Sequence, residues 1–102
     1  MTDPIDLHRA VTRAARARAI LEDELVAEAL GMIEANLRQA WEHSRFDDTP
    51  GREEAYRMLR AARSFRAWFE QALSDGKVAA AEIRLRQEAT ARQAGALEGE
   101  DL

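Results

Sequence analysis

The sequence contains no cysteine, and of its 102 residues only two are proline and five are glycine. Without cysteine the chain can form neither a disulfide bond nor a thiolate metal site, and no feature points to an oxidising compartment. No apolar run approaches the roughly 20 residues that a membrane-spanning helix needs. The first six residues include two aspartates and no apolar stretch, which is unlike a secretory signal. These absences predict a soluble cytoplasmic protein that does not bind membranes.

What the sequence does contain is typical of helices. Hydrophobic residues, many of them alanine, make up 46% of the chain, and charged residues make up 33%. Alanine, glutamate, arginine and leucine favour helix, and a chain of this length forms at most one domain with a modest core. We therefore expect an all-α fold. It would be an antiparallel helical hairpin with a short N-terminal helix and a weaker C-terminal helix, assembled into an oligomeric bundle.

Residues 1–22 form the first predicted unit, a basic N-terminal helical arm. Asp3 can cap its helix, and Pro4 fits the first helical position. The segment 1–18 carries four arginines and two aspartates, whereas the segment 19–48 carries two arginines and eight acids. The charge therefore changes sign between the arm and the helix that follows it.

Residues 23–76 form the predicted core, a helical hairpin with its turn near 47–51. Asp23 can cap the first long helix, and Thr49 the second. Gly31, inside the first helix, indicates either the close approach of another helix or a tolerated weakness. Apolar residues recur at steps of three and four, which fits shallow-angle bundle packing. The predicted seam consists of Val26, Leu30, Ile33, Leu37 and Trp41, and of Ala55, Met58, Ala62, Phe65, Phe69 and Ala72.

The hairpin is expected to end at Ser74-Asp75-Gly76, with Gly76 in the left-handed conformation that closes many helices. Residues 77–94 predict a weaker C-terminal helix with few large apolar side chains. Residues 95–102 contain two glycines and three acids, and they predict a disordered acidic tail.

Both long helices carry more apolar side chains than a two-helix seam can bury. Self-association is the direct inference, and the aromatic residues could also form a docking site for a different protein. The alternative is that these aromatic residues simply belong to the core. The residues expected to contact a partner or a second copy are Leu25, Met32, Trp41, Leu59, Trp68 and Phe69.

Arginines form two groups. Arg9, Arg13, Arg16 and Arg18 lie in a stretch without acids, and such a cluster can contact DNA phosphates without sequence preference. The second group consists of every third residue from Arg57 to Arg66. Its alternative role is to pair with nearby glutamates and with the acidic helix, which suits a chain whose net charge is −4.

The sequence offers no catalytic motif. It has no glycine-rich phosphate loop, no nucleophile elbow and no pair of histidines at metal-ligand spacing. Its two histidines, His8 and His43, are expected to be surface or helix-end residues. We therefore predict a protein that is not an enzyme and that uses no metal or other cofactor.

The stretch 21–85 resembles small phage-type proteins of head morphogenesis and DNA packaging, and the nearest function is that of a terminase small subunit. The resemblance rests on these residues: Glu28-Ala29-Leu30, Ile33-Glu34, Ala40-Trp41, Asp48-Thr49, Arg52, Tyr56, Leu59-Arg60 and Gly76-Lys77. It implies a non-enzymatic homo-oligomer, assembled as a ring through a helical-hairpin core. Such a protein presents phage DNA and docks to the large terminase subunit.

The chain departs from the small-terminase pattern in one respect, because too few residues precede the first long helix for the usual N-terminal helix-turn-helix domain. The DNA contact implied is therefore non-specific and falls to the arginine arm. The alternative function is that of a protein-only helical adaptor or regulator, which binds a partner through an aromatic face.

Overall fold

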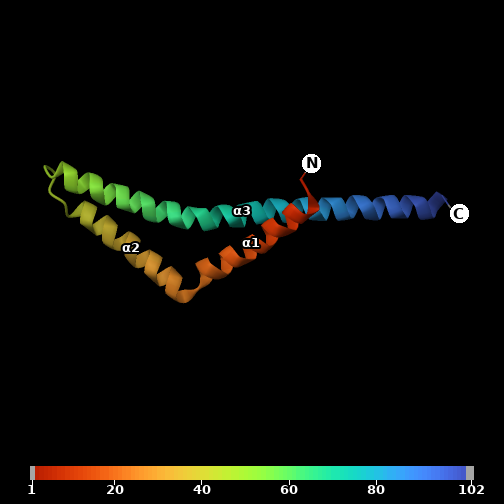
Figure 1. Ribbon diagram of the computed structural model, residues 1–102, viewed down its shortest axis with the longest axis horizontal. Helices are drawn as coiled ribbons and strands as arrows, with labels where there is room; N and C mark the ends of the chain where they lie inside the picture. The colour runs from red at the N-terminus through yellow and green to blue at the C-terminus, as the bar shows by residue number, and fades with distance from the viewer. Residues whose placement is uncertain (1, 101–102) are drawn as a thin grey trace.

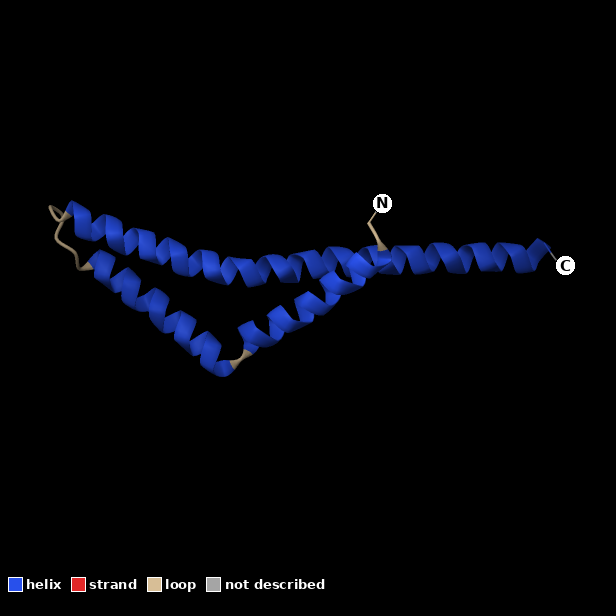
Figure 2. Cartoon of the chain, in the orientation of Figure 1, coloured by secondary structure: helices blue, strands red, loops and turns tan. Residues whose placement is uncertain are grey.

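The computed structural model describes residues 2–100, and it is all-α: three helices and, in this range, no strand. Helix α1 spans Pro4–Glu22, α2 spans Glu24–Glu42 and α3 spans Thr49–Glu100. Helix α3 runs the whole length of the molecule, and α1 and α2 lie antiparallel to it as the two arms of a V (Figure 1). The junction of the two arms points away from α3, and the only longer loop joins α2 to α3 among the described residues (Figure 2).

Two aspartates set the starts of α1 and α2, as the sequence predicts. Asp3 accepts a hydrogen bond from the backbone N–H of Ile5 at 2.8 Å. Asp23 accepts from the N–H groups of Leu25 and Val26, both at 3.0 Å, and its own backbone is extended. This cap satisfies the first amides of α2 and breaks the helix after Glu22, so the arm and the acidic helix are separate elements.

The turn between α2 and α3 lies a little earlier than predicted. Thr49 is already helical, and it is Asp48 that accepts a hydrogen bond from the N–H of Gly51, at 3.2 Å. A carboxylate caps more strongly than the threonine hydroxyl would, and it suits the positive end of the helix dipole. The guanidinium of Arg52 lies 4.9 Å from the ring centre of Trp41, which ties the end of α2 to the start of α3.

The predicted stop at Ser74-Asp75-Gly76 is wrong, because α3 continues through it as one helix. No described residue has a positive φ, so Gly76 does not adopt the left-handed conformation. Residues 77–94 are therefore not a separate helix. Residues 95–100 are helical rather than disordered, and residues 101–102 of the predicted tail lie outside the described range. Alanines and long polar side chains, which favour helix, carry α3 through this region.

The reason for a glycine at position 76 is the close approach of α1. A methyl group built on Gly76 would overlap the side chain of Ala14. The other residues buried where α1 packs on α3 are mostly small, namely Leu7, Ala17 and Ala79. Gly31, by contrast, has no neighbouring atom in the position a methyl group would take. No other helix of this chain therefore approaches Gly31 closely, and the close approach occurs at Gly76 instead.

The predicted stripe on α3 is wrong at two positions, each displaced by one residue, whereas Ala55, Ala62, Phe69 and Ala72 are buried or half-buried as predicted. Leu59 is buried and Arg66 is half-buried, whereas Met58 and Phe65, the predicted seam residues, are half exposed. On α2, Leu30 is buried and Ile33 is half exposed. Arg66 occupies the seam because its Nε donates to Glu34 Oε1 at 2.8 Å, so a charged pair lies where apolar periodicity predicts only apolar side chains.

The molecule is a rod. Its radius of gyration is 22.6 Å, against about 13 Å for a compact domain of this length. Its accessible surface is 8209 Å² for 11.5 kDa, whereas a typical folded monomer of this mass exposes about 5,800 Å². The core is correspondingly small: only six apolar residues are buried among the described ones, and three of them are alanines.

Candidate interaction surfaces

One side of the rod collects large apolar side chains. Each of them immediately precedes a residue of the helical seam: Ile20 precedes Leu21, Leu25 precedes Val26, Ile33 precedes Glu34, Met58 precedes Leu59, Phe65 precedes Arg66, and Trp68 precedes Phe69. One residue is a rotation of about 100° around a helix. Because α1 and α2 run antiparallel to α3, the same rotation brings side chains of facing helices to the same side. We call these six exposed residues the lateral apolar face.

Other contacts support this arrangement. Ile20 of α1 and Trp68 of α3 line one surface depression together, and the ring of Phe65 lies 5.2 Å from that of Phe69, edge to face. On the opposite side of the α2–α3 pair, Arg38 and Arg63 line a different depression. The lateral apolar face is highly exposed, with Leu25 at 76% and Trp68 at 68%.

Three of the four predicted DNA-contact arginines extend the same side along α1. Arg9, Arg13 and Arg16 each precede a seam alanine, so they share the side of the lateral apolar face. Arg13 and Arg16 line the depression that holds Trp68. Arg18 follows Arg16 by two residues, a rotation of about 200°, so it points to another side. The four arginines are therefore not one patch.

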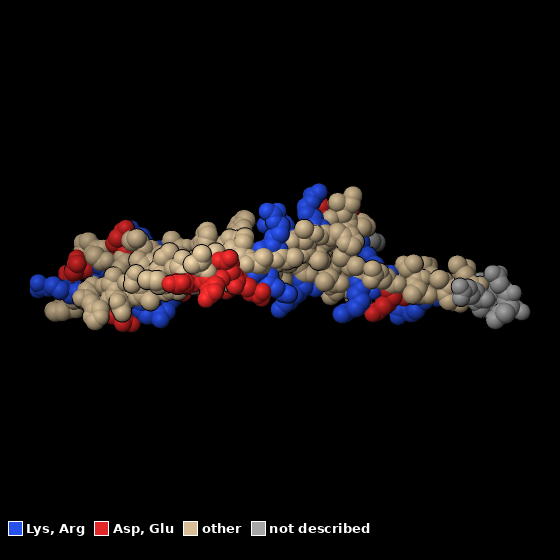
Figure 3. Space-filling view, turned by 90° about the horizontal axis from the view of Figure 1, so that it is seen from below, with Lys and Arg blue, Asp and Glu red and all other residues tan. Residues whose placement is uncertain are grey.

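The arginines of α1 make few ion pairs. Arg9 reaches Asp6 at 3.8 Å, with both side chains mostly exposed. Within residues 2–100 no ion pair involves Arg13, Arg16 or Arg18. Acidic side chains gather at the junction of α1 and α2, with uncharged surface on one side of them and basic side chains on the other (Figure 3). In this view the surface therefore changes along the rod from uncharged to acidic and then to basic.

Two of the four members of the second arginine group pair with glutamates, as its alternative role predicts, whereas Arg60 and Arg63 make no ion pair among the described side chains. Arg66 pairs with Glu34 across the seam, and Arg57 lies 3.5 Å from Glu54 on its own helix. Arg60 lies 6.0 Å from the ring centre of Tyr56. Of these contacts, only the pair of Arg66 and Glu34 is shielded from solvent.

The six predicted contact residues differ in how exposed they are in the structure. Leu25, Met32 and Trp68 are exposed. Trp41 is 41% exposed but is covered on one face by Arg52. Phe69 is half-buried in the seam. Leu59 is buried at 8% exposure, so the prediction that it contacts a partner is wrong; the adjacent Met58 is the exposed residue.

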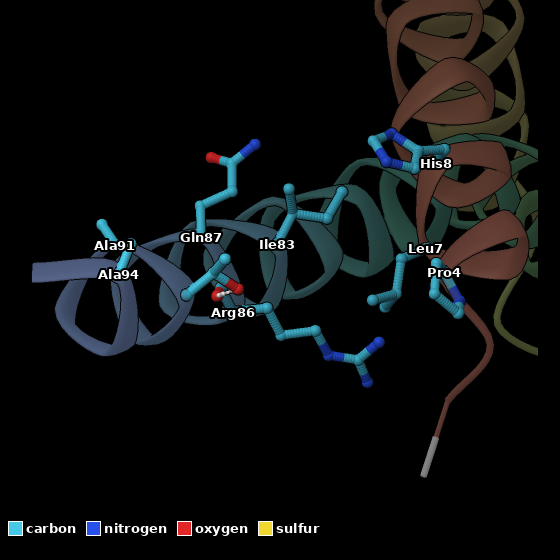
Figure 4. Close-up of a pocket in the computed structure, with 9 residues that line it drawn as sticks. Pro4, Leu7, His8, Ile83, Arg86, Gln87, Ala91 and Ala94 are labelled. Atoms are coloured by element: carbon cyan, nitrogen blue, oxygen red, sulfur yellow. Dashed lines mark hydrogen bonds between the residues drawn. The ribbon is translucent and has the colours of Figure 1, made fainter. Parts of the chain in front are cut away.

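The structure contains a second surface that the sequence does not predict. An open groove of about 490 Å³ lies where α1 begins, against the C-terminal half of α3 (Figure 4). No local pattern predicts this groove, because it depends on α3 continuing through Gly76, where the sequence predicts a break. Its lining residues are Pro4, Leu7, His8, Ile83, Arg86, Gln87, Thr90, Ala91 and Ala94.

No group of three or more acidic, histidine or cysteine side chains that could hold a metal ion occurs in the described part of the chain. None of the helices, over the same residues, is both long and apolar enough to cross a membrane. The arrangement offers surfaces for binding other macromolecules. Comparisons of the chain with family models, with curated proteins and with solved structures found no match.

Proposed function

We propose that this chain is a non-enzymatic helical assembly protein, which associates with copies of itself and docks to other proteins. The observation that carries the proposal is the surplus of surface. The chain exposes 8209 Å², roughly 2,400 Å² more than a globular monomer of its mass. A standard protein interface buries about 800 Å² on each partner. The surplus is therefore enough for large contacts with more than one neighbour.

The composition of the lateral apolar face supports the same function. Trp68 lines one surface depression together with Arg13 and Arg16 at one end of it, and Phe65 precedes Trp68 by about one turn of α3. Aromatic side chains and arginine are enriched at the centres of protein interfaces, where they contribute most of the binding energy. A monomer would leave this face in water.

The more specific form of the proposal is phage-type DNA packaging. The resemblance of residues 21–85 implies a terminase small subunit-like protein that docks to the large subunit. The placement of Arg9, Arg13 and Arg16 on one side of α1 is compatible with non-specific phosphate contact, because three guanidinium groups in a row can follow a backbone.

Absolute mass in solution tests the assembly proposal. Light scattering on a sizing column, at low and at moderate salt, should give a discrete mass of two or more subunits. A mass of many subunits would support a ring. A monomer of 11.5 kDa at all concentrations would overturn the proposal.

Retention of duplex DNA tests the packaging form. Replacing Arg9, Arg13 and Arg16 with glutamate should abolish retention at low salt, while the control Arg18→Glu should weaken it only slightly. Retention by the unaltered chain should fall steeply as salt rises. Equal retention by the triple variant and the unaltered chain would exclude this arm as the contact.

A protein-only adaptor is the second candidate, and the position of Arg13 and Arg16 beside Trp68 favours it. Guanidinium groups next to an exposed indole are as suited to a protein partner as to phosphate. This function predicts an assembled protein that retains no DNA even at low salt. It also predicts a stoichiometric complex with one protein, lost on Trp68→Ala.

A further inference from the structure

The two arms of the V are equal in length and opposite in charge. Helices α1 and α2 have 19 residues each, and they meet at Asp23 (Figure 1). Helix α1 carries four arginines, Asp6 and Glu22, a net charge of +2, whereas α2 carries four glutamates and Arg38, a net charge of −3. A rotation of 180° about an axis that passes through the junction and lies across α3 therefore exchanges two arms that match in size and attract each other.

The lateral apolar face allows such a symmetry, because all three helices contribute to it on one side of the molecule. Trp68 of α3 lies level with the junction, since it lines a depression together with Ile20, three residues before Asp23. Leu25 and Ile33 lie on the α2 side of this level, and the arginines of α1 lie on the other. The junction and Trp68 thus define a line that crosses the middle of the V and lies within the face.

We propose that the lateral apolar face is covered by the same face of a second copy, related to the first by a two-fold axis along this line. Helix α3 then packs antiparallel on α3 of the second copy, α1 packs on α2 of the second copy, and α2 packs on its α1. Each copy gives the surface that it receives, as in other isologous dimers. The proposal rests on the self-association proposed above and specifies its surface and its orientation.

Charge complementarity favours a second copy in this orientation. Arg13 and Arg16 lie on the side of the face, and Glu24 and Glu28 each lie two residues before a seam residue of α2, at the edge farthest from α3. Within residues 2–100 none of these four side chains forms an ion pair. The antiparallel dimer brings the arginines of each copy beside the glutamates of the other, at two equivalent places. An axis along α3 would instead set α1 on α1 and α2 on α2, so that like charges face each other.

The charged side chains that α3 carries on this side lie away from the axis. Glu54, Asp75 and Glu82 each precede a seam residue, and between Glu54 and Asp75 the same side is uncharged, with Met58, Ala61, Phe65 and Trp68. The three acids already have partners on their own helix: Arg57 at 3.5 Å from Glu54, Gln71 at 2.9 Å from Asp75, and Arg86 at 3.0 Å from Glu82. An apolar centre with a charged rim is the usual composition of a protein interface.

The area of the face is that of a dimer contact. Its six large side chains are 39–76% exposed, and at about 200 Å² for a fully exposed one they present roughly 700 Å² of apolar surface. A standard interface buries about 800 Å² on each partner. The aliphatic parts of Arg13 and Arg16, which flank Ile20 and Trp68, supply the remainder.

Charge reversal on separate chains tests which arms meet. Arg13→Glu/Arg16→Glu and Glu24→Arg/Glu28→Arg should each raise the dissociation constant of the dimer about tenfold or more, because both arm contacts become repulsive. An equimolar mixture of the two variants should dimerise about as well as the unaltered chain, since both arm contacts of the mixed dimer join opposite charges. Sedimentation equilibrium measures all three, and mass is the readout because Arg13 and Arg16 also belong to the proposed DNA contact.

The matched control is Arg18→Glu/Arg84→Glu, which makes the same change in net charge. Arg18 points to another side of α1, and Arg84 follows the seam residue Ile83, so neither lies on the lateral apolar face. The control should leave the dissociation constant within about threefold. Circular dichroism of each variant shows whether the helices are intact.

Spin-label distances test the orientation without altering the face, and the chain has no cysteine of its own. Labels on Ser64→Cys, four residues from Trp68, should be separated by about 12 Å along the helices, and labels on Arg84→Cys, 16 residues from Trp68, by about 48 Å. Equal distances at the two positions would show a parallel dimer and would overturn the proposal.

The outcomes separate this proposal from the one it rests on. If the unaltered chain is a monomer, self-association itself fails. If the chain is an oligomer but the reversed variants assemble no worse than the control, or if their mixture does not restore the dimer, α1 does not meet α2 of a second copy. Assembly then uses another surface, and the lateral apolar face is left for a different protein.

Discussion

Helix α3 is covered by α1 along one part of its length and by α2 along another, and the two seams are built differently. Against α1, the contact consists mostly of alanines and Gly76, with Leu7 as its one large buried side chain, and at Gly76 the backbones come so close that a single methyl group would not fit. Against α2, the contact uses larger side chains, Leu30 and Leu59, together with the ion pair of Arg66 and Glu34.

The difference determines which surfaces are left for partners. A close seam of small residues joins two helices firmly but buries few methylene groups, so it contributes little hydrophobic stabilisation. A seam of larger side chains holds the helices farther apart and leaves the neighbouring apolar residues, such as Met58 and Phe65, in water. The α2–α3 part therefore leaves large apolar side chains in water on both of its helices.

The largest effect is expected in the seam of large side chains. Leu59→Ala should lower the free energy of unfolding by about 2–4 kcal/mol, because it removes a buried leucine and leaves a cavity. The matched variant Met58→Ala changes the adjacent, half-exposed residue. Under the proposed assembly, it should lower only the part of the free energy of unfolding that depends on protein concentration. The reason is that Met58 is half exposed within the chain and would be buried by a second copy. Chemical denaturation at two protein concentrations separates the two effects, and equal losses would place the seam at Met58.

The next effect belongs to the close seam. Gly76→Ala improves helix propensity by about 1 kcal/mol, yet the added methyl group overlaps Ala14. Overpacking at a rigid contact costs about 1–3 kcal/mol, so the net change should be a loss of stability. A thermal melt measures it. A rise in melting temperature would show that α1 does not approach α3 this closely.

Positions 59 and 76 also show which features of the fold could be predicted from the sequence and which could not. The all-α fold and the aspartate caps were predictable, because caps and apolar periodicity are local signals. Whether the cap at Asp23 interrupts the first helix was not, since a capping residue can also lie within a continuous helix. The role of Gly76 was not, since a helix-ending glycine and a glycine that admits a neighbouring helix look the same in one sequence. The choice of Leu59 over Met58 was also not predictable. Two adjacent apolar residues fit the period equally well, and the partner helix decides between them.

The interaction surfaces also include some features that the sequence predicts and some that it does not. Leu25, Met32 and Trp68 were predicted as surplus to the seam, and the structure exposes all three. The groove at the start of α1 could not be predicted, because it depends on where α1 ends against α3 and not on any local pattern. That Arg18 points away from Arg9, Arg13 and Arg16 follows from helical rotation alone, which a grouping by position in the sequence does not take into account.

A smaller effect is expected from the ion pair that sits in the seam of large side chains. Glu34 and Arg66 have side chains that are 21% and 33% exposed, so solvent screens their attraction only in part. A double-mutant cycle with Glu34→Gln and Arg66→Gln should give a coupling of about 1 kcal/mol. The exposed pair of Arg57 and Glu54 is the control and should give a coupling near zero. Equal couplings would mean that the seam does not shield its charges.

The smallest effect, and one of opposite sign to that at Gly76, is expected at Gly31. This residue lies in α2 with nothing within 4 Å of the place a methyl group would take. Gly31→Ala should therefore raise the free energy of unfolding by about 0.5–1 kcal/mol, because alanine loses less backbone entropy in a helix. Thermal melts of Gly31→Ala and Gly76→Ala at one protein concentration provide the comparison. The two helices pack on α3 differently if the same substitution stabilises one position and destabilises the other. Loss of stability at both positions would instead mean that α2, like α1, is approached closely, whether by α3 or by a second copy of the chain.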